Sequence, residues 1–175
     1  KLGTDVSLGP EMKSTGEVMG ISNSVGVSFA KSQLASHNPI TPSGQIFLSL
    51  SDVDKAQGCK LAEKFVNLGF SICATGGTHR ALQQKNIPSI SVQKISEGRP
   101  NICDLMMNGE VAMAINTSDD NSNKNDTTQI RAQILKSKIP YFTTLSAASM
   151  VIEAIKAMKQ SDINIPNALQ DCLKN

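Results

Sequence analysis

The sequence predicts a three-layer α/β fold, in which helices cover both faces of a five-stranded parallel sheet and an N-terminal tail precedes it. One observation is the regular alternation of short apolar runs with longer helical patterns from residue 44 onward. Another is the composition, since 39% of the 175 residues are hydrophobic and only 3% are aromatic. A core that is almost wholly aliphatic is typical of a buried parallel sheet covered by helices.

The first 43 residues do not share this alternation. Residues 1–22 are rich in Gly and Ser and have no hydrophobic period, whereas residues 22–36 are compatible with a helix. Two prolines and a glycine within residues 37–44 interrupt any regular element there. We therefore divide the chain into a segment 1–43 and a domain 44–175.

The first half of the domain reads as strand, helix, strand, helix, strand. Ser51 and Asp54 suggest a capping pattern at the start of the first of these helices, and Gly69 stands just after its predicted end. The predicted strands cover 45–50, 70–74 and 90–92, and the helices between them cover 52–68 and 78–86.

The second half continues the pattern. Its most apolar run, 111–115, is the best candidate for a central strand. The other elements are helices over 100–108, 126–137 and 146–159, a strand over 140–143, a polar loop over 117–125, and one short helix after Pro166.

Residues suited to an anion follow several of the predicted strands. In a doubly wound parallel sheet, ligands bind outside the carboxyl ends of the strands. The loops at those ends supply hydroxyl groups, a pair of glycines and two lysines. The phosphate-binding candidates are Ser49, Lys55, Thr75, Gly76, Gly77, Thr78 and Lys94.

Each of these parts has a physical use. Gly76 and Gly77 let the backbone approach an anion closely and direct N–H groups toward it. The helix predicted from Thr78 offers unpaired N–H groups and the positive end of its dipole. Lys55 and Lys94 add full positive charges. Taken singly these are ordinary turn and surface residues, but their convergence at one edge predicts a phosphate-binding site.

The loop after the fourth strand is the candidate for recognising the part of the ligand beyond its phosphate. The amide of Asn116 is both donor and acceptor, so it can recognise the edge of a base or a ribose. We include its neighbours Thr117 and Ser118 in this second set.

The sequence shows no catalytic signature. His37 lies in the linker, and His79 is expected on the exposed side of a short helix, so we assign both a solvated role. Asp119 and Asp120 fall in a polar loop and are interpreted as a solvated tip. Because no nucleophile–base pair and no carboxylate pair emerges, the chain is predicted to bind rather than to react, and no metal site is expected.

The composition limits the classes of binding partner and the cellular compartment that we expect for this chain. The net charge of +2, without a basic run interleaved with aromatics, does not favour nucleic acid. No apolar run is long enough to span a bilayer, so no membrane association is expected. The four cysteines are far apart and are interpreted as buried thiols in a reducing compartment, which favours the cytoplasm. They are Cys59, Cys73, Cys103 and Cys172.

Two sets of motifs resemble a known family. Residues 8–20 (LGPEMKSTGEVMG) resemble the end of the second ATP-grasp synthetase unit of the carbamoyl phosphate synthetase large subunit. From residue 44 on, the chain resembles that subunit's C-terminal regulatory domain, which has a methylglyoxal-synthase-like fold with flavodoxin-like winding. The motifs of this second part are LSLS at 48–51, ATGGT at 74–78, EGRP at 97–100, INT at 115–117, QIR at 129–131 and TTL at 143–145.

The resemblance implies a regulatory site for a nucleoside monophosphate, with UMP as inhibitor and IMP as activator in many bacterial forms. Matched by motif, the phosphate would be held by Ser49, Lys55, Thr75, Thr78 and Lys94, and Asn116 and Thr117 would lie near the ribose and base. Thr143 matches a position that touches ornithine, which makes it a candidate for a second effector.

The parent enzyme would make carbamoyl phosphate, for pyrimidine and arginine synthesis, from bicarbonate, ammonia drawn from glutamine, and two ATP with Mg²⁺ or Mn²⁺. The resemblance implies that this segment is itself non-catalytic and carries no cofactor. Its expected partners are the effector, the upstream synthetase domains, a glutaminase small subunit and further copies of itself.

Two other readings stay open. One is an enzyme of the same fold, either a methylglyoxal synthase acting on dihydroxyacetone phosphate or the related IMP cyclohydrolase. The other is a structural module for oligomerisation. The sequence does not fix which nucleotide would bind, nor whether it would inhibit or activate.

Overall fold

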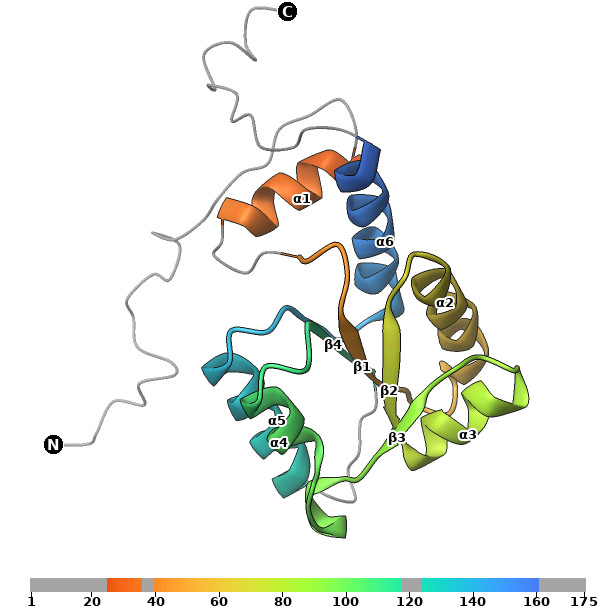
Figure 1. The fold of residues 1–175 in the computed structure, drawn as a ribbon, viewed down its shortest axis with the longest axis vertical. Helices are drawn as coiled ribbons and strands as arrows, with labels where there is room; N and C mark the ends of the chain where they lie inside the picture. Colours follow the sequence, from red (N-terminus) through yellow and green to blue (C-terminus); the bar gives the residue numbers. More distant parts are fainter. Residues whose placement is uncertain (1–24, 36–39, 118–123, 161–175) are drawn as a thin grey trace, which may run out of the picture.

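A computed structural model describes residues 25–35, 40–117 and 124–160 of the chain. Its centre is a five-stranded sheet in which every pair of neighbouring strands is parallel, in the order β3-β2-β1-β4-β5. Helices lie on both sides of this sheet (Figure 1). The predicted fold class, a three-layer α/β fold with five parallel strands, is confirmed.

The strands lie close to their predicted positions. β1 forms the middle of the sheet and β4 lies beside it, so the apolar run expected to be central is an inner strand with a neighbour on each side. The strands are β1 (Gln45–Ser49), β2 (Ser71–Thr75), β3 (Ile90–Val92), β4 (Met113–Asn116) and β5 (Tyr141–Phe142).

The winding differs from the expected one. A flavodoxin-like sheet has the strand order 2-1-3-4-5, whereas here the first three strands run outward from β1 and the chain then returns to place β4 on the other side of β1. This reversal puts the topological switch point between β1 and β4, where Ser49 and Asn116 are register partners. Ligands of doubly wound sheets bind at such a point.

Alternate strand residues point to two separate cores, because side chains along a strand alternate between its faces. Ile46 and Leu48 of β1 belong to one core, and Phe47 between them belongs to the other; all three are at most 1% exposed. The first core is covered by α2 (Lys55–Asn67), α3 (Gly76–Gln84) and α6 (Leu145–Gln160), and the second by α4 (Ile102–Met107) and α5 (Lys124–Lys136).

α1 (Val25–Ala35) packs against α6 on the outer side of the first core (Figure 1). The helices approach closely at Gly26, where a Cβ would lie 2.8 Å from the carbonyl oxygen of Glu153. Phe29 also packs on the core, with its ring centroid 6.5 Å from that of Phe142. This helix precedes the predicted domain boundary yet contacts the α/β domain.

The starts of α2 and α3 differ from the prediction, and α5 also begins two residues early, at Lys124 rather than at residue 126. α2 begins at Lys55 rather than at residue 52, and Ser51 does not cap it: the Ser51 hydroxyl donates to the Asp54 carboxylate at 2.7 Å within the preceding turn. α3 begins at Gly76, two residues early, so both glycines lie in its first turn. The predicted helix end at Gly69 is confirmed, since its φ is +94° and its N–H donates to the Val66 carbonyl at 2.9 Å.

The region between β3 and α4 contains a turn that the sequence pattern did not indicate. A short 3₁₀ helix, η2 (Ile95–Glu97), follows β3. Asn101 then caps α4, accepting from the Cys103 N–H at 3.0 Å, while its own N–H donates to the Asp104 carboxylate at 2.9 Å. Because of this cap, α4 starts two residues later than predicted.

Some expectations fall outside the described residues. These are the motif at 8–20, the linker residue His37, Ser118, the pair Asp119 and Asp120, Cys172 and the short helix after Pro166. Among the helices that the structure describes, none has the length and apolar character needed to cross a membrane.

Candidate functional site

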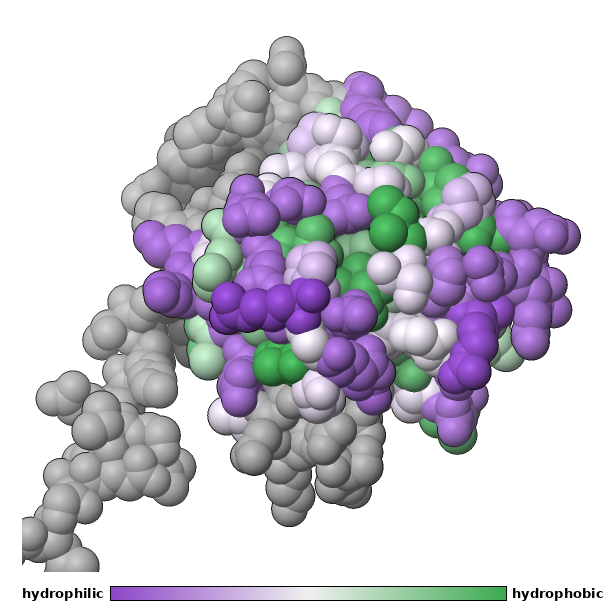
Figure 2. Space-filling view, turned by 60° about the horizontal axis from the view of Figure 1, so that its bottom comes forward, coloured by the Kyte–Doolittle hydropathy of each residue, from purple (hydrophilic) through white to green (hydrophobic). Residues whose placement is uncertain are grey.

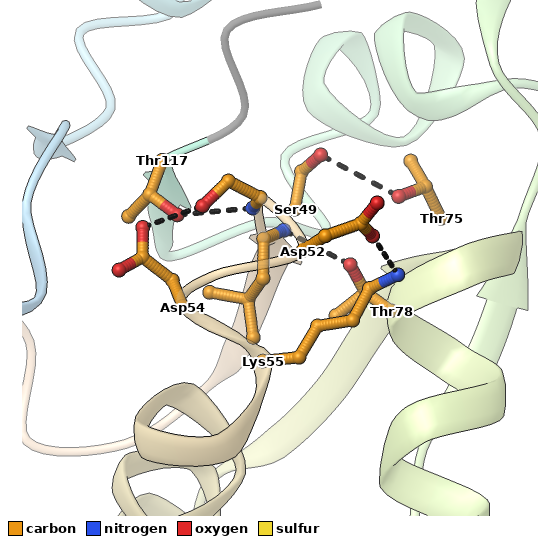
Figure 3. A network of polar contacts seen from close by, with 9 residues as sticks. Ser49, Asp52, Asp54, Lys55, Thr75, Thr78 and Thr117 are labelled. Atoms are coloured by element: carbon orange, nitrogen blue, oxygen red, sulfur yellow. Dashed lines mark hydrogen bonds and ion pairs between the residues drawn. The ribbon is translucent and has the colours of Figure 1, made fainter.

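Three hydroxyl residues lie buried where β1 and β2 end. Ser49 closes β1, Thr75 closes β2, and Thr78 lies in the first turn of α3; we call these three residues the hydroxyl cluster. Their exposed fractions are only 9%, 6% and 2%. Buried hydroxyls need hydrogen-bond partners. The Thr75 hydroxyl donates to Ser49 Oγ at 3.4 Å, and Thr78 Oγ1 accepts the Leu50 N–H at 2.9 Å (Figure 3).

Lys55 places a positive charge beside this cluster. A Cβ built at Gly77 would lie 3.6 Å from Lys55 Nζ, so the ammonium stands next to the first turn of α3. A Cβ built at Gly76 would meet nothing within 4 Å, so the backbone there is open to approach. The first N–H groups of a helix have no intrahelical partner and carry the positive end of its dipole. The ammonium and the helix start together favour an anion at this place.

Lys55 already has an acidic partner that the sequence reasoning did not single out. Its ammonium donates to the carboxylate of Asp52, in the turn between β1 and α2 (Figure 3). The hydrogen bond from Lys55, and then its charge, lower the pKa of Asp52 below the ordinary value. The signal was available in the sequence as an acidic residue three positions before a lysine.

The end of β4 is tied to the same turn. The Thr117 N–H donates to the Ser49 carbonyl at 2.9 Å, and Thr117 Oγ1 accepts the Ser51 N–H at 3.2 Å. Hydrogen bonds from the hydroxyls of Ser51 and Thr117 lower the pKa of Asp54. Figure 3 shows Thr117 and Asp54 facing each other. The Thr117 hydroxyl therefore helps to join the loop after β4 to the loop after β1. We call the edge of the sheet formed by the carboxyl ends of the strands, with the loops that follow them, the rim.

Two further predicted residues, Asn116 for the base or ribose and Lys94 for the phosphate, lie where β4 and β3 end, on either side of β1 and β2. Asn116 is 7% exposed and closes β4 beside Ser49, at the switch point. Lys94 follows β3 and is half-buried, and its N–H donates to the Glu97 carboxylate at 2.8 Å. Since β3 pairs with β2, Lys94 extends the same rim beyond Thr75.

Thr143 lies apart from the hydroxyl cluster. It follows β5, the outer strand on the far side of β4, and its side chain is exposed. The structure thus brings together Ser49, Lys55, Thr75, Gly76, Gly77, Thr78 and Thr117, with Asn116 beside Ser49. It leaves Thr143 two strands away from β1.

The histidine and cysteine expectations have mixed outcomes. The prediction that His79 is solvated is wrong, because its side chain is half-buried and its Nδ1 lies 2.8 Å from Ser89 Oγ. This contact joins α3 to the residue immediately before β3. Cys59 and Cys73 are buried thiols as predicted, and burial raises the pKa of Cys73 to about 12, but Cys103 is only half-buried. Within the described ranges, no three His, Cys, Asp or Glu side chains gather so as to hold a metal ion.

The side of the molecule at the bottom of Figure 1 is mainly polar. Figure 2 brings the lower side of Figure 1 forward, and hydrophilic residues dominate that face, with small apolar areas between them.

The protein-family comparison matches residues 57–143 to the MGS-like domain. The chain therefore contains an MGS-like domain. The match includes Thr75, Thr78, Lys94 and Asn116, while Ser49 and Lys55 lie just before it. The all-parallel five-stranded sheet agrees with this family.

Curated relatives extend the similarity beyond the MGS-like domain. The carbamoyl phosphate synthase large chain of Helicobacter pylori is 54% identical over 98% of this chain, and that of Campylobacter jejuni is 47% identical over 99%. The C-terminal section of the Aquifex aeolicus large chain is 43% identical over 89%. This chain spans only 16% of the length of the first two relatives and 29% of the third. The family that the motifs pointed to is thereby confirmed.

Proposed function

We propose that this chain is an allosteric domain that binds a nucleoside monophosphate at the rim of its sheet. The observation that carries the proposal is the Lys55 ammonium, 3.6 Å from a Cβ built at Gly77, beside the first turn of α3. A cation and unpaired helix N–H groups facing one space are suited to a phosphate dianion. The hydroxyl cluster at the same edge supplies further donors.

In this proposal the phosphate rests over the first turn of α3. Gly76, Gly77 and the hydroxyl cluster bind its oxygens, and Lys55 neutralises its charge. Lys94, from the adjoining strand end, adds a second positive charge. Asn116, Thr117 and Ser118 contact the ribose or base, with Asn116 nearest to the switch point. UMP and IMP are the effectors we expect, and Thr143 belongs to a separate site for a second effector such as ornithine.

We further propose that the domain regulates a glutamine-hydrolysing carbamoyl phosphate synthetase. Relatives covering nearly all of this chain are named carbamoyl phosphate synthase large chain, which supports this role. The upstream synthetase domains would carry the chemistry with ATP and Mg²⁺ or Mn²⁺, and a glutaminase small subunit would supply ammonia. Carbamoyl phosphate supply to pyrimidine and arginine synthesis in the cytoplasm would then respond to the nucleotide.

Such regulation requires that the effector bind one conformation of the larger enzyme better than another. The coupling must then be reciprocal, so that ligands of the synthetase domains change the affinity of the nucleotide by the same factor. A domain that only holds copies together would bind no nucleotide. A methylglyoxal synthase would convert dihydroxyacetone phosphate to methylglyoxal, and that assay separates it from the proposed role.

The test is a calorimetric titration of the chain with UMP and with IMP. Replacing Lys55 by Met should weaken binding by about 1–3 kcal/mol, roughly 5- to 150-fold, because a charge-assisted hydrogen bond to phosphate is lost. Lys60→Met is the matched control, since Lys60 is exposed on the same helix. No binding by the unmodified chain, or equal affinity in the Lys55→Met and Lys60→Met variants, would count against the proposal.

A further inference from the structure

The ion pair between Asp52 and Lys55 lies at the proposed phosphate site. Asp52 belongs to the turn after β1, and Lys55, three residues later, is the first residue of α2. Their side chains are 93% and 30% exposed, so the carboxylate is in water while the ammonium is partly enclosed. Figure 3 shows the Asp52 side chain turned toward Lys55 Nζ. The ammonium that would bind the anion is therefore already bonded to an anion of the chain itself.

We propose that Asp52 is a built-in competitor for this site, so that a phosphate group must displace its carboxylate from Lys55 in order to bind. This inference rests on the proposed function and describes how affinity at the same site is limited. It assigns Asp52 a role in setting the threshold for the effector, distinct from the role of the residues that hold it.

The charges argue for competition rather than for a shared site. Two oxygen ligands on one ammonium would lie within roughly 5 Å of each other, and a carboxylate and a phosphate dianion repel strongly at that separation. Asp52 is 93% exposed, and an exposed carboxylate is ionised at neutral pH, so the repulsion persists when the phosphate is present. Protonation of Asp52 therefore does not relieve this repulsion at physiological pH.

The exposure of Asp52 makes its release inexpensive. An ion pair with one almost fully exposed partner contributes little to stability, because that partner is well solvated when it is released. Asp52 can therefore turn into water without leaving a buried charge unpaired, whereas Lys55 stays beside Gly77. An exposed, exchangeable carboxylate on a partly enclosed ammonium is an arrangement from which a doubly charged anion can displace the carboxylate.

The opposite role would be positioning, in which Asp52 holds Lys55 ready for the phosphate. In that case removing the carboxylate would weaken binding. The two roles therefore predict changes of opposite sign, and a single neutral substitution of equal size separates them. Asp52→Asn keeps the shape and removes the charge.

The experiment measures UMP binding to the 175-residue chain by NMR titration, which also records weak affinities. Asp52→Asn should tighten binding by about 3- to 10-fold, because a competing like charge is removed. Glu63→Gln, the same change of charge at an exposed position of α2, controls for net charge and should leave the affinity unchanged. Inorganic phosphate, titrated in parallel, should show the same order of affinities if the competition concerns the phosphate group.

A double-mutant comparison tests whether Asp52 acts through Lys55. In a Lys55→Met background, Asp52→Asn should change the affinity by less than about 2-fold, because residues that act on one shared partner are not additive. An equal gain in both backgrounds would overturn the inference, as would weaker or unchanged binding by Asp52→Asn alone. These results leave the proposed function intact, whereas a wild-type chain that binds neither UMP nor phosphate defeats both.

Discussion

The carboxyl ends of β1 and β2 and the carboxyl end of β5 lie on the same edge of one sheet, and both carry threonines, yet they are built differently. At the first place Thr75 and Thr78 are almost fully buried and hydrogen-bonded across 26 and 28 residues of sequence. At the second, Thr143 is exposed, and the hydroxyl of the neighbouring Thr144 accepts the Ala147 N–H, three residues away, at 3.2 Å.

The difference shows that the burial of a threonine and its hydrogen-bond partners, rather than the residue type, distinguish the candidate binding site from an ordinary helix cap. The ends of β1 and β2 have a neighbouring strand on each side, and the turn at 51–54 and the start of α3 close over them. β5 is an outer strand of two residues, so its end has a strand on one side only. The four substitutions below test this contrast, beginning with the largest expected effect.

Thr78→Val should lower the free energy of unfolding by about 1–3 kcal/mol, because the buried Leu50 N–H loses its acceptor. The side chain keeps its size, so the loss reports the hydrogen bond rather than a cavity. Urea denaturation would measure it as a lower midpoint with an unchanged slope. A variant as stable as the parent chain would remove the claim that these hydroxyls are structurally required.

Thr144→Val should have a smaller effect, about 0.5–2 kcal/mol, because it removes the cap of α6. The N–H it leaves free is at an exposed helix start, where water can replace the hydroxyl. Thermal denaturation would measure the change, and Thr144→Ser, which keeps the oxygen, should restore most of the stability. If Thr144→Val costs more than Thr78→Val, the proposed contrast between the two regions is reversed.

Gly77→Ala should raise the free energy of unfolding by about 0.5–1 kcal/mol, since Gly is unfavourable within a helix. Its φ is not positive, and a Cβ there would make only an ordinary contact at 3.6 Å with Lys55 Nζ. At the same time we expect weaker UMP binding, because the methyl group would stand between the ammonium and the helix start.

Gly69→Ala serves as the control for that prediction. It should destabilise the chain, because its φ of +94° is unfavourable for any residue with a Cβ. Chemical denaturation and a UMP titration of both variants separate the two effects. If Gly77→Ala is stabilised and binds UMP as well as the parent chain does, the phosphate does not rest on the first turn of α3.

Thr143→Val should be the mildest change, within about 0.5 kcal/mol in stability, as is usual for exposed positions. UMP affinity should also be unchanged, since β4 separates this residue from β1. A calorimetric titration checks this directly. Loss of UMP binding would mean that the rim works as one continuous site rather than as two regions.

Much of the fold could be predicted from the sequence, because strand and helix periods are visible in neighbouring residues. β1, β3 and the helix end at Gly69 follow from apolar runs and from one glycine. The start of α3 was misplaced because two glycines do not favour a helix locally. There the helix starts directly where β2 ends, since β2 extends to Thr75 in order to pair with Val92 of β3.

The candidate site was only half predictable. The residue types that gather there, and the sheet edge at which they gather, follow from the rule that parallel strands end together. Their pairing does not, because Ser51 resembles a helix cap and instead binds Asp54, and His79 resembles a solvated residue and instead meets Ser89. These contacts depend on how turns fold back, which short sequence windows do not encode.

The sequence by itself determined that this chain alternates strands with helices around an aliphatic core and ends its strands in hydroxyls, glycines and lysines. Those properties arise from local sterics and from burial, which act over a few residues at a time. Only the tertiary structure decided that the chain reverses after β3, so that Asn116 meets Ser49, and that Asp52 turns onto Lys55 beside Gly77. The physical reason is that strand order and turn geometry bring together residues that are apart in the sequence. The contact between Asp52 and Lys55 then decides how much positive charge the rim offers to an anion.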